Sequence, residues 1–168
     1  MTAETDFRAV FSHLGAIANY ARRRGSADAD GLAAEVMTIA WRRLDDVSKD
    51  DPRPWLYATA RNLLLEEHRK RGRLRHVPER EAASPAPELD ELDPQLNRAL
   101  LALRPLDREA LLLVAWEDLT PTQAARALGI NAAAFRVRLL RARRRLQALL
   151  ADGGGPTLSV PQLDVEGS

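Results

Sequence analysis

The stretch that most constrains the fold is residues 119–149, which predicts two helices joined by a tight turn. Thr120 can cap the first helix, and Gln123 stands at capping-box spacing, so that each side chain satisfies an orphan backbone N–H. Gly129 suits the left-handed residue that commonly ends a helix, and Asn131 can cap the helix that follows. This arrangement of caps around one glycine predicts a helix-turn-helix.

The second of these helices is predicted to have one apolar face and one basic face. At about 100° per residue, the apolar residues fall on one stripe, which comprises Phe135, Leu139, Ala142, Leu146 and Leu149. The rest of the surface carries Arg136, Arg138, Arg141, Arg143, Arg144 and Arg145. No acidic residue lies between Asp118 and Asp152. Because a merely solvated face normally mixes both charge signs, we favour binding in the DNA major groove over a basic helix that closes a bundle.

The composition limits the classes of function that are open to the chain. It has 168 residues and a net charge of +1, so any affinity for nucleic acid must come from local patches. It has no cysteine, which excludes disulfides and thiolate-bound metals. Alanine, leucine and arginine dominate while β-branched residues are few, which favours an all-α fold.

The sequence shows no sign of a membrane segment, a cofactor site or an active site. No apolar run approaches the roughly 20 residues of a membrane helix, and the N-terminus is not typical of a signal peptide, so we expect a cytoplasmic protein. His13, His68 and His76 have no metal-ligand spacing. The chain also has no phosphate-binding glycine loop and no nucleophile beside a base. We therefore expect no enzyme, no metal and no cofactor.

The N-terminal part of the chain predicts three helices. Apolar residues at helical spacing predict a first helix from Phe7 to Arg24, with Gly25 as its stop and cations that complement the dipole of its last turn. A second helix is expected to begin near Asp28 or Asp30, because negative charge is favourable at a helix N-terminus.

A third helix is predicted from Pro52 to Gly72. The stretch after it is rich in proline and acidic residues, which is typical of a flexible linker. Helical spacing resumes at Asp93, is interrupted at Pro105 and leads into the helix-turn-helix. We therefore expect two small helical domains on a tether: a domain over 5–75, an acidic linker over 76–92, a domain over 93–150 and a disordered tail over 151–168.

The third predicted helix combines aromatic and basic side chains, namely Trp55, Tyr57, Arg61, Asn62, Arg69 and Arg71. Rings that stack on bases, beside cations that bind phosphates, are a common means of holding unpaired nucleic acid. The alternative is that Trp55 anchors the core of a small bundle, as large aromatic residues often do. Tyr57 lies on a different side of the helix, so we do not expect both rings to be buried alike.

The order of these parts resembles the extracytoplasmic-function sigma factors, which are two-domain bacterial transcription initiation factors. The resemblance covers about residues 6–150. It is carried by DADGLAAEVMTIAWRRLDDV, then PRPWLYATARNLLLEEHRKRGR, then the acidic linker, and then DREALLLVAWEDLTPTQAARALGINAAAFRVRLLRARRRLQ. The run PWLYATARN with its trailing basic residues, joined to a C-terminal helix-turn-helix, is a combination specific enough to indicate this family.

The resemblance implies a function for each part. The second helix would dock on the clamp helices of core RNA polymerase through a segment that contains Asp28, Asp30, Glu35, Trp41, Arg42 and Leu44. The third helix would recognise and help melt the −10 promoter element with the aromatic and basic residues named above. The helix-turn-helix would read the −35 element with Thr122, Gln123, Asn131, Ala133, Ala134, Arg136, Val137, Arg138, Arg141 and Arg144. The linker would occupy polymerase channels, and an anti-sigma factor is an expected partner.

The chain departs from the family pattern at Gly31, where a second acidic residue is usual, and at Ala34 and Met37, so its docking surface is less acidic. It departs again at Val137, which the helical wheel places among the arginines where a small polar residue is common. Our hypothesis is that Val137 contacts thymine methyl groups, an apolar form of base readout.

A second hypothesis is an ordinary helix-turn-helix regulator that acts without docking on polymerase. Such a protein would bind a palindromic operator tightly as a dimer, with half-sites one helical turn apart. Two distinct nucleic-acid surfaces and the lack of an evident ligand pocket favour the sigma factor.

Overall fold

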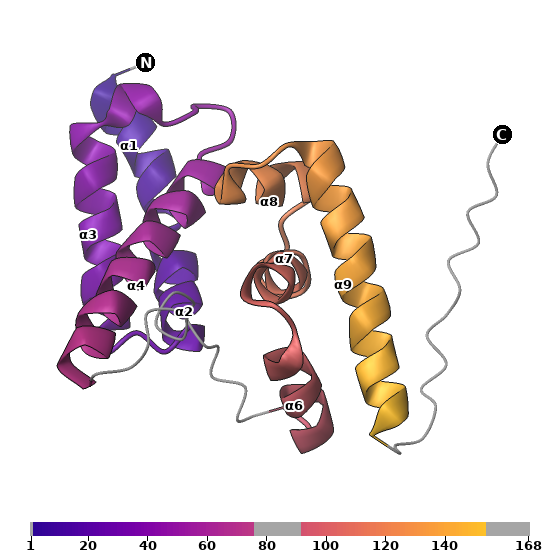
Figure 1. Ribbon diagram of the computed structural model, residues 1–168. Coiled ribbons are helices and arrows are strands. Elements are labelled where there is room, and N and C mark those ends of the chain that lie inside the picture. The colour runs from indigo at the N-terminus through magenta and orange to yellow at the C-terminus, as the bar shows by residue number, and fades with distance from the viewer. Residues whose placement is uncertain (1, 76–91, 154–168) are drawn as a thin grey trace, which may run out of the picture.

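The computed structural model describes residues 2–75 and 92–153, and within these stretches every regular element is helical (Figure 1). This confirms the all-α class and the two helical domains. The predicted linker, apart from Leu92, and the tail beyond Gly153 lie outside the described residues. The elements are α1 (Ala3–Phe11), α2 (Leu14–Arg23), α3 (Ala29–Arg42), η1 (Leu44–Asp46), α4 (Arg53–Arg75), α6 (Pro94–Ala102), α7 (Pro105–Ala115), α8 (Pro121–Leu128) and α9 (Ala132–Asp152).

The first predicted helix is two helices, so that prediction was wrong. The chain breaks at Ser12 and His13, where the Ser12 hydroxyl donates to the carbonyl of Ala9 at 2.6 Å. Val10 before the break and Ile17 after it are both buried. The apolar spacing did not reveal the break because both segments turn their apolar residues toward the same core.

The helices α3 and α4 begin as predicted, but α4 ends later. Asp28 caps α3 by accepting from the backbone N–H of Gly31 at 2.9 Å. The helix α4 continues through Gly72, which was the predicted end. One glycine inside a helix costs only about 1 kcal/mol. In addition, the Arg71 guanidinium holds the last turns by donating to Glu67 Oε1 at 2.9 Å and to the carbonyl of Gly25 at 2.8 Å.

The helix-turn-helix is confirmed down to its caps. The Thr120 hydroxyl accepts from the Gln123 N–H at 3.2 Å, and Gln123 Oε1 accepts from the Thr120 N–H at 2.9 Å. Gly129 has φ of 67°, in the left-handed region that favours glycine. Asn131 Oδ1 accepts from Ala133 N–H at 2.8 Å and caps α9. The turn between α8 and α9 is therefore specified by local hydrogen bonds.

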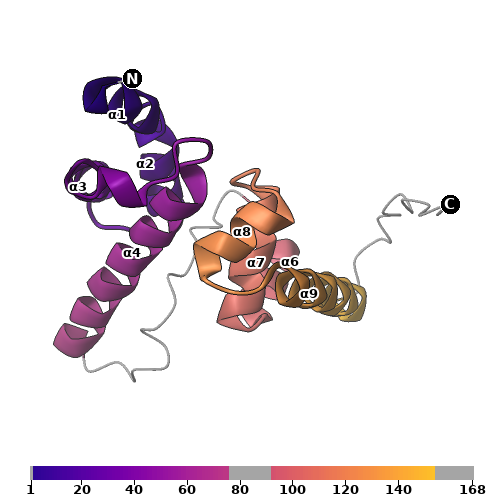
Figure 2. The same cartoon turned by 90° about the horizontal axis from the view of Figure 1, so that it is seen from above.

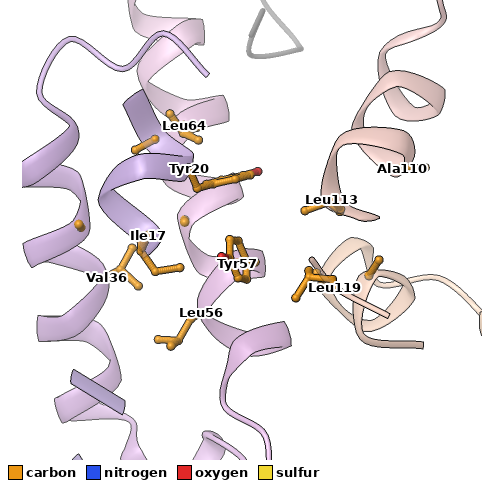
Figure 3. Packing of buried hydrophobic residues seen from close by; sticks show 14 of the residues in the cluster. Ile17, Tyr20, Val36, Leu56, Tyr57, Leu64, Ala110, Leu113 and Leu119 are labelled. Carbon is orange, nitrogen blue, oxygen red and sulfur yellow. The ribbon is translucent and has the colours of Figure 1, made fainter. Parts of the chain in front are cut away.

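The two domains pack against each other through α8. Figures 1 and 2 show α8 beside α4 on one side and α9 on the other, and residue contacts join both pairs. The buried apolar residues of both domains form one continuous cluster. Figure 3 shows Tyr57 of α4 on the side of the first domain that faces Leu113 and Leu119. The arrangement is therefore closed, with the predicted nucleic-acid helix α4 at the domain boundary.

The capping box predicts a measurable contribution to stability. Thr120→Ala removes the acceptor for the Gln123 N–H, and we expect it to lower the free energy of unfolding by about 1 kcal/mol. Thr120→Ser retains the hydroxyl and serves as the control, with a smaller loss. Urea denaturation followed by circular dichroism measures both. Equal losses in the two variants would show that the cap adds nothing.

Candidate nucleic-acid interface

The basic face of α9 is exposed as the sequence predicts. Phe135, Leu139 and Ala142 are buried against the rest of the domain, and five arginines are exposed: Arg136, Arg141, Arg143, Arg144 and Arg145. Asn131 caps the start of α9, and this cap holds the helix that carries these arginines. The arrangement can bind a polyanion along one side of α9.

Arg138 differs from its neighbours because it is half-buried and paired. Its Nη1 lies 2.8 Å from Oδ1 of Asp107 on α7. Arg136 remains exposed, with its Nη2 at 3.4 Å from the hydroxyl of Thr122 on α8. The pairing of Arg138 was not predicted, because Asp107 stands 31 residues earlier in the sequence.

The first turns of α9 present small and apolar groups beside these arginines. Ala133 and Ala134 are exposed, whereas the Asn131 side chain is occupied as the cap. Val137 is 48% exposed, so it points away from the core as the helical wheel predicts. Leu140 is exposed to the same extent and follows Val137 by three residues, which places the two side chains next to each other on the helix surface. The helix therefore offers an apolar strip within its basic face.

The aromatic and basic residues of α4 share one helix but not one exposed face. Tyr57 is 3% exposed and packs edge-on against Tyr20 with the ring centroids 5.2 Å apart, while Trp55 is only half-buried. The two rings are thus not buried alike, as expected. Arg61 is half-buried with its Nε shielded from solvent, and Arg71 is held as described above.

Asn62 and Arg69 complete the predicted set on α4, and both are exposed. Asn62 follows Arg61 directly, while Arg69 lies in the C-terminal half of the helix. In this arrangement Asn62, Arg69 and part of the Trp55 ring are accessible to solvent on α4, whereas Tyr57 is buried.

The predicted polymerase-docking residues lie at both ends of α3. Asp28 and Glu35 line a groove of about 400 Å³ between α3 and α4, together with Glu66 and Glu67 of α4. Asp30 projects at the same end, where it pairs with Arg22 at 3.4 Å. This end of the first domain is strongly acidic.

At the other end of α3, Trp41 and Arg42 are exposed and Leu44 is half-buried. Trp41 is 52% exposed, with its ring edge-on to Phe7 at 5.0 Å. A helix of this length spans about 20 Å. The docking candidates therefore form two patches rather than one.

The sequence did not reveal a cluster of charged side chains at the domain boundary. Arg24 at the end of α2 is fully buried and makes a bidentate pair with Glu109 of α7, with Nε–Oε2 at 3.1 Å and Nη2–Oε1 at 3.2 Å. Tyr20 donates its hydroxyl to Glu109 Oε1 at 3.0 Å. Glu117 approaches the same guanidinium, with Oε1 at 3.6 Å from Nη1.

Two further contacts involve Glu117 and extend this cluster. Arg23 Nη2 lies 3.4 Å from Glu117 Oε2, and Arg53 Nη2 donates to the Glu117 carbonyl at 2.6 Å. The available signal in the sequence was Glu109, a carboxylate that directly precedes the apolar run of α7. A charge at such a position requires a partner, but not one that the sequence identifies.

Pairing decides the charge state of this cluster. Burial acts to raise the pKa of Glu109, but the charge of Arg24 and the hydrogen bonds from Arg24 and Tyr20 outweigh it and lower that pKa. Burial also opposes the charge of Arg24, yet Glu109 raises its pKa. At Glu117, burial prevails over Arg24 and Arg23, so its pKa is raised. The Arg24–Glu109 pair is therefore ionised inside the protein.

In the part of the chain that the structure describes, no cluster of three histidine or carboxylate residues is arranged to bind a metal ion. Among residues 2–75 and 92–153, no helix is long and apolar enough to span a bilayer.

Comparison with known proteins identifies both domains. The family described as Sigma-70 region 2 matches residues 10–74, and that described as Sigma-70, region 4 matches residues 94–146. The chain is 33% identical over 162 residues to the RNA polymerase sigma factor NccH of Alcaligenes xylosoxydans xylosoxydans, with 84% of each protein covered. It is also 30% identical over 143 residues to the ECF RNA polymerase sigma factor SigE of Mycolicibacterium smegmatis, covering 77% of this chain and 54% of SigE.

The chain belongs to the extracytoplasmic-function sigma factors. It is thus an RNA polymerase sigma factor. Its fold is similar to the sigma factor RpoE in the co-crystal structure with the anti-sigma factor NepR from Bartonella quintana. That likeness has a TM-score of 0.61 at 25% identity and covers 86% of this chain and 95% of RpoE. The region 2 match of this sigma factor contains the end of α1 and the helices α2–α4, and the region 4 match contains α6–α8 and most of α9.

The geometry of α9 predicts two classes of arginine. Arg141→Ala and Arg144→Ala should weaken promoter binding alike for all sequences and reduce the salt slope by about one each, because they would lose phosphate contacts. Arg136→Ala and Arg138→Ala, near the start of the helix, should change the preference between −35 sequences, and for Arg138 a base contact requires that its pair with Asp107 opens on DNA. Fluorescence anisotropy of the holoenzyme on promoter variants measures both, with Arg8→Ala as the control. A uniform loss from all four variants would contradict this division.

Proposed function

We propose that this sigma factor directs core RNA polymerase to a specific set of promoters, which it grips at two points. The observation that supports the proposal is that one chain matches both Sigma-70 region 2, over the segment that contains α4, and Sigma-70 region 4, over the segment that contains most of α9. We propose that it does so in the cytoplasm, where polymerase and promoters are found, and performs no catalytic chemistry of its own.

For the −35 element, we propose that the domain over residues 93–150 places α9 in the major groove of duplex DNA. The candidate residues are Thr122, Gln123, Asn131, Ala133, Ala134, Arg136, Val137, Arg138, Arg141 and Arg144. The exposed start of α9 supports base contacts there, and the arginines farther along support contacts with phosphates. Thr122 and Gln123 stand at the start of α8, where backbone N–H groups also favour a phosphate.

For the −10 element, we propose that the domain over residues 5–75 holds unpaired bases of the melted strand with α4. Trp55 and Tyr57 would supply stacking surfaces, while Arg61, Asn62, Arg69 and Arg71 would bind phosphates and base edges. Asn62 and Arg69 are exposed in the closed arrangement. Tyr57 needs a change of the domain arrangement before a base can reach it.

For core polymerase, we propose docking at the two patches of α3, with Asp28, Asp30 and Glu35 at one and Trp41, Arg42 and Leu44 at the other. The acidic groove supports binding to a basic helical surface. The structure explains why glycine stands at position 31: a Cβ there would collide with the Asp28 carboxylate that caps α3. A second acidic side chain at position 31 would thus compete with the cap.

An anti-sigma factor is a further proposed partner, since the structurally similar RpoE was crystallised with the anti-sigma factor NepR. The acidic groove and the exposed Trp41 are surfaces that such a partner could cover. The alternative of a helix-turn-helix regulator independent of polymerase is not favoured, because the region 2 match covers α2, α3 and nearly all of α4, the segment that such a regulator would use for another purpose.

The decisive test is transcription in vitro. Core polymerase with this protein on fragmented genomic DNA should initiate at a restricted set of start sites that share asymmetric −35 and −10 elements. Polymerase alone should initiate at none of them, and an Asn62→Ala/Arg69→Ala variant should bind core but open promoters at least about tenfold less. Tight binding of the free protein to a palindrome, without any effect on start sites, would overturn the proposal.

Val137 provides a test of base readout. We expect Val137→Ser to relax a preference for thymine at one position of the −35 element, because the serine lacks the apolar surface that would meet a thymine methyl group. Selection of −35 sequences from a random library by holoenzymes with valine, serine or alanine at this position measures the preference. Leu140→Ser is the control for loss of a neighbouring apolar group. Unchanged base preference in Val137→Ser would sink the hypothesis.

A further inference from the structure

Two arginines flank Val137 near the start of α9, and neighbouring helices hold them to different degrees. Arg136 and Arg138 lie on opposite sides of Val137, each about 100° away around the helix. Arg136 Nη2 lies 3.4 Å from the neutral hydroxyl of Thr122, a long contact that restrains it little. Arg138 Nη1 instead donates to the Asp107 carboxylate at 2.8 Å, which is a charge-assisted hydrogen bond. Only one of the two flanking cations therefore has an anionic partner.

The carboxylate of Asp107 is held beside α9 by the helix that carries it. Asp107 stands in the first turn of α7, where the helix dipole favours a negative charge. The apolar residues that follow in α7 are buried, and α7 packs against α9. Among the arginines of α9, Arg138 alone forms an ion pair with another described residue. Asp107 thus belongs to the helix-turn-helix domain and moves with it when the domain binds DNA.

The pair between Asp107 and Arg138 is solvated enough to open. The Arg138 side chain is 36% exposed and that of Asp107 is 22% exposed, whereas Arg24 has no exposed surface. A partly exposed ion pair changes an equilibrium constant by up to about fivefold. A bidentate contact of an arginine with O6 and N7 of guanine discriminates against other bases by about 5- to 150-fold. Guanine can therefore take the guanidinium from Asp107, while a base with a weaker acceptor pattern leaves the pair intact.

We infer that Asp107 is a specificity-determining residue of the −35 contact, because it competes with the promoter for Arg138. The inference rests on the proposed function, since it requires that α9 lies in the major groove. Asp107 acts through Arg138 and does not itself need to touch DNA.

The competition has a defined effect on the range of promoter strengths. A −35 element with guanine at the position that Arg138 reads must break the pair, so its affinity is lowered by the full strength of the pair. An element with another base at that position leaves the pair closed and loses little. Asp107 therefore reduces the difference between strong and weak −35 elements.

Two other roles for Asp107 lead to different results. If Asp107 holds Arg138 in the orientation that contacts DNA, loss of the carboxylate weakens binding. If the pair only joins α7 to α9, its loss lowers the stability of the domain and leaves the base preference unchanged.

The test measures binding of the holoenzyme, formed from core polymerase and the full-length chain, to promoter fragments with each of the four bases at each −35 position. Asp107→Asn removes the charge with little change of shape, and Asp107→Glu retains the charge. Asp152→Asn is the matched control, because it changes the net charge equally at an exposed position of α9 about 20 Å from Arg138. Arg138→Ala identifies the base position that Arg138 reads.

We expect Asp107→Asn to bind about three- to fivefold more tightly to fragments with guanine at that position, and less than about twofold more tightly to the others. Asp107→Glu should bind as the parent does, and Asp152→Asn should show no base-dependent change. Asp107→Asn should also have no base-dependent effect when Arg138 is already alanine, since the double-mutant cycle isolates the coupling between the two residues.

Four results would overturn the inference. They are weaker binding of Asp107→Asn to every fragment, a change that is equal for all bases or absent, a base-dependent gain that persists without Arg138, and an unchanged base preference in Arg138→Ala. Circular dichroism checks that each variant is folded. If Asp107→Asn unfolds, Asp107→Ser makes the same comparison with a smaller polar side chain at the start of α7.

The parent holoenzyme separates this inference from the proposed function. Parent binding that depends on the −35 sequence, together with no base-dependent effect of Asp107→Asn, would refute the inference alone. Parent binding that ignores the −35 sequence, together with the absence of promoter-specific transcripts, would refute the proposed function itself.

Discussion

The arrangement of the two domains depends on a single buried ion pair, Arg24 with Glu109. A guanidinium with no exposed surface is tolerated only because its charge is met by a bidentate carboxylate, with a second carboxylate nearby. Each partner comes from a different domain, so neither domain can satisfy this burial by itself. The apolar contacts of Tyr57 with the facing domain add area, but the ion pair specifies which surfaces meet.

The helix-turn-helix is organised in the opposite way. Its geometry is specified by short-range hydrogen bonds around Thr120, Gln123 and Asn131, and by the left-handed Gly129. These bonds lie within the second domain, and only Gln123, whose Nε2 donates to Asp51 Oδ2 at 3.0 Å, is also held by the first domain. The shape of the basic face of α9 therefore depends mainly on contacts within its own domain.

The features that the sequence predicted well are those with local causes. The predicted caps of α8 and α9 follow from single side chains that stand next to the backbone groups they satisfy, and α3 and α6 begin beside the acidic residues where the sequence placed their starts. The exposure of Val137 follows from helical periodicity alone. Two predictions about helix ends were wrong. The break at Ser12 leaves the helical spacing of the apolar residues intact, so the sequence does not reveal it. The helix α4 continues past Gly72 because Arg71 donates to the carbonyl of Gly25, in a loop distant in sequence.

The sequence by itself determined most of the helices, the caps of the helix-turn-helix and the apolar stripes, because each of these depends on residues within a few positions of one another. It also determined the family, through the order of these parts along the chain. Only the tertiary structure decided the charge pairs: Arg24 with Glu109 across 85 residues, and Arg138 with Asp107 across 31. On a helical wheel, a basic residue that faces DNA and one that is buried against a carboxylate look the same. Long-range packing alone distinguishes them, because it determines which cation loses its water and which carboxylate replaces it.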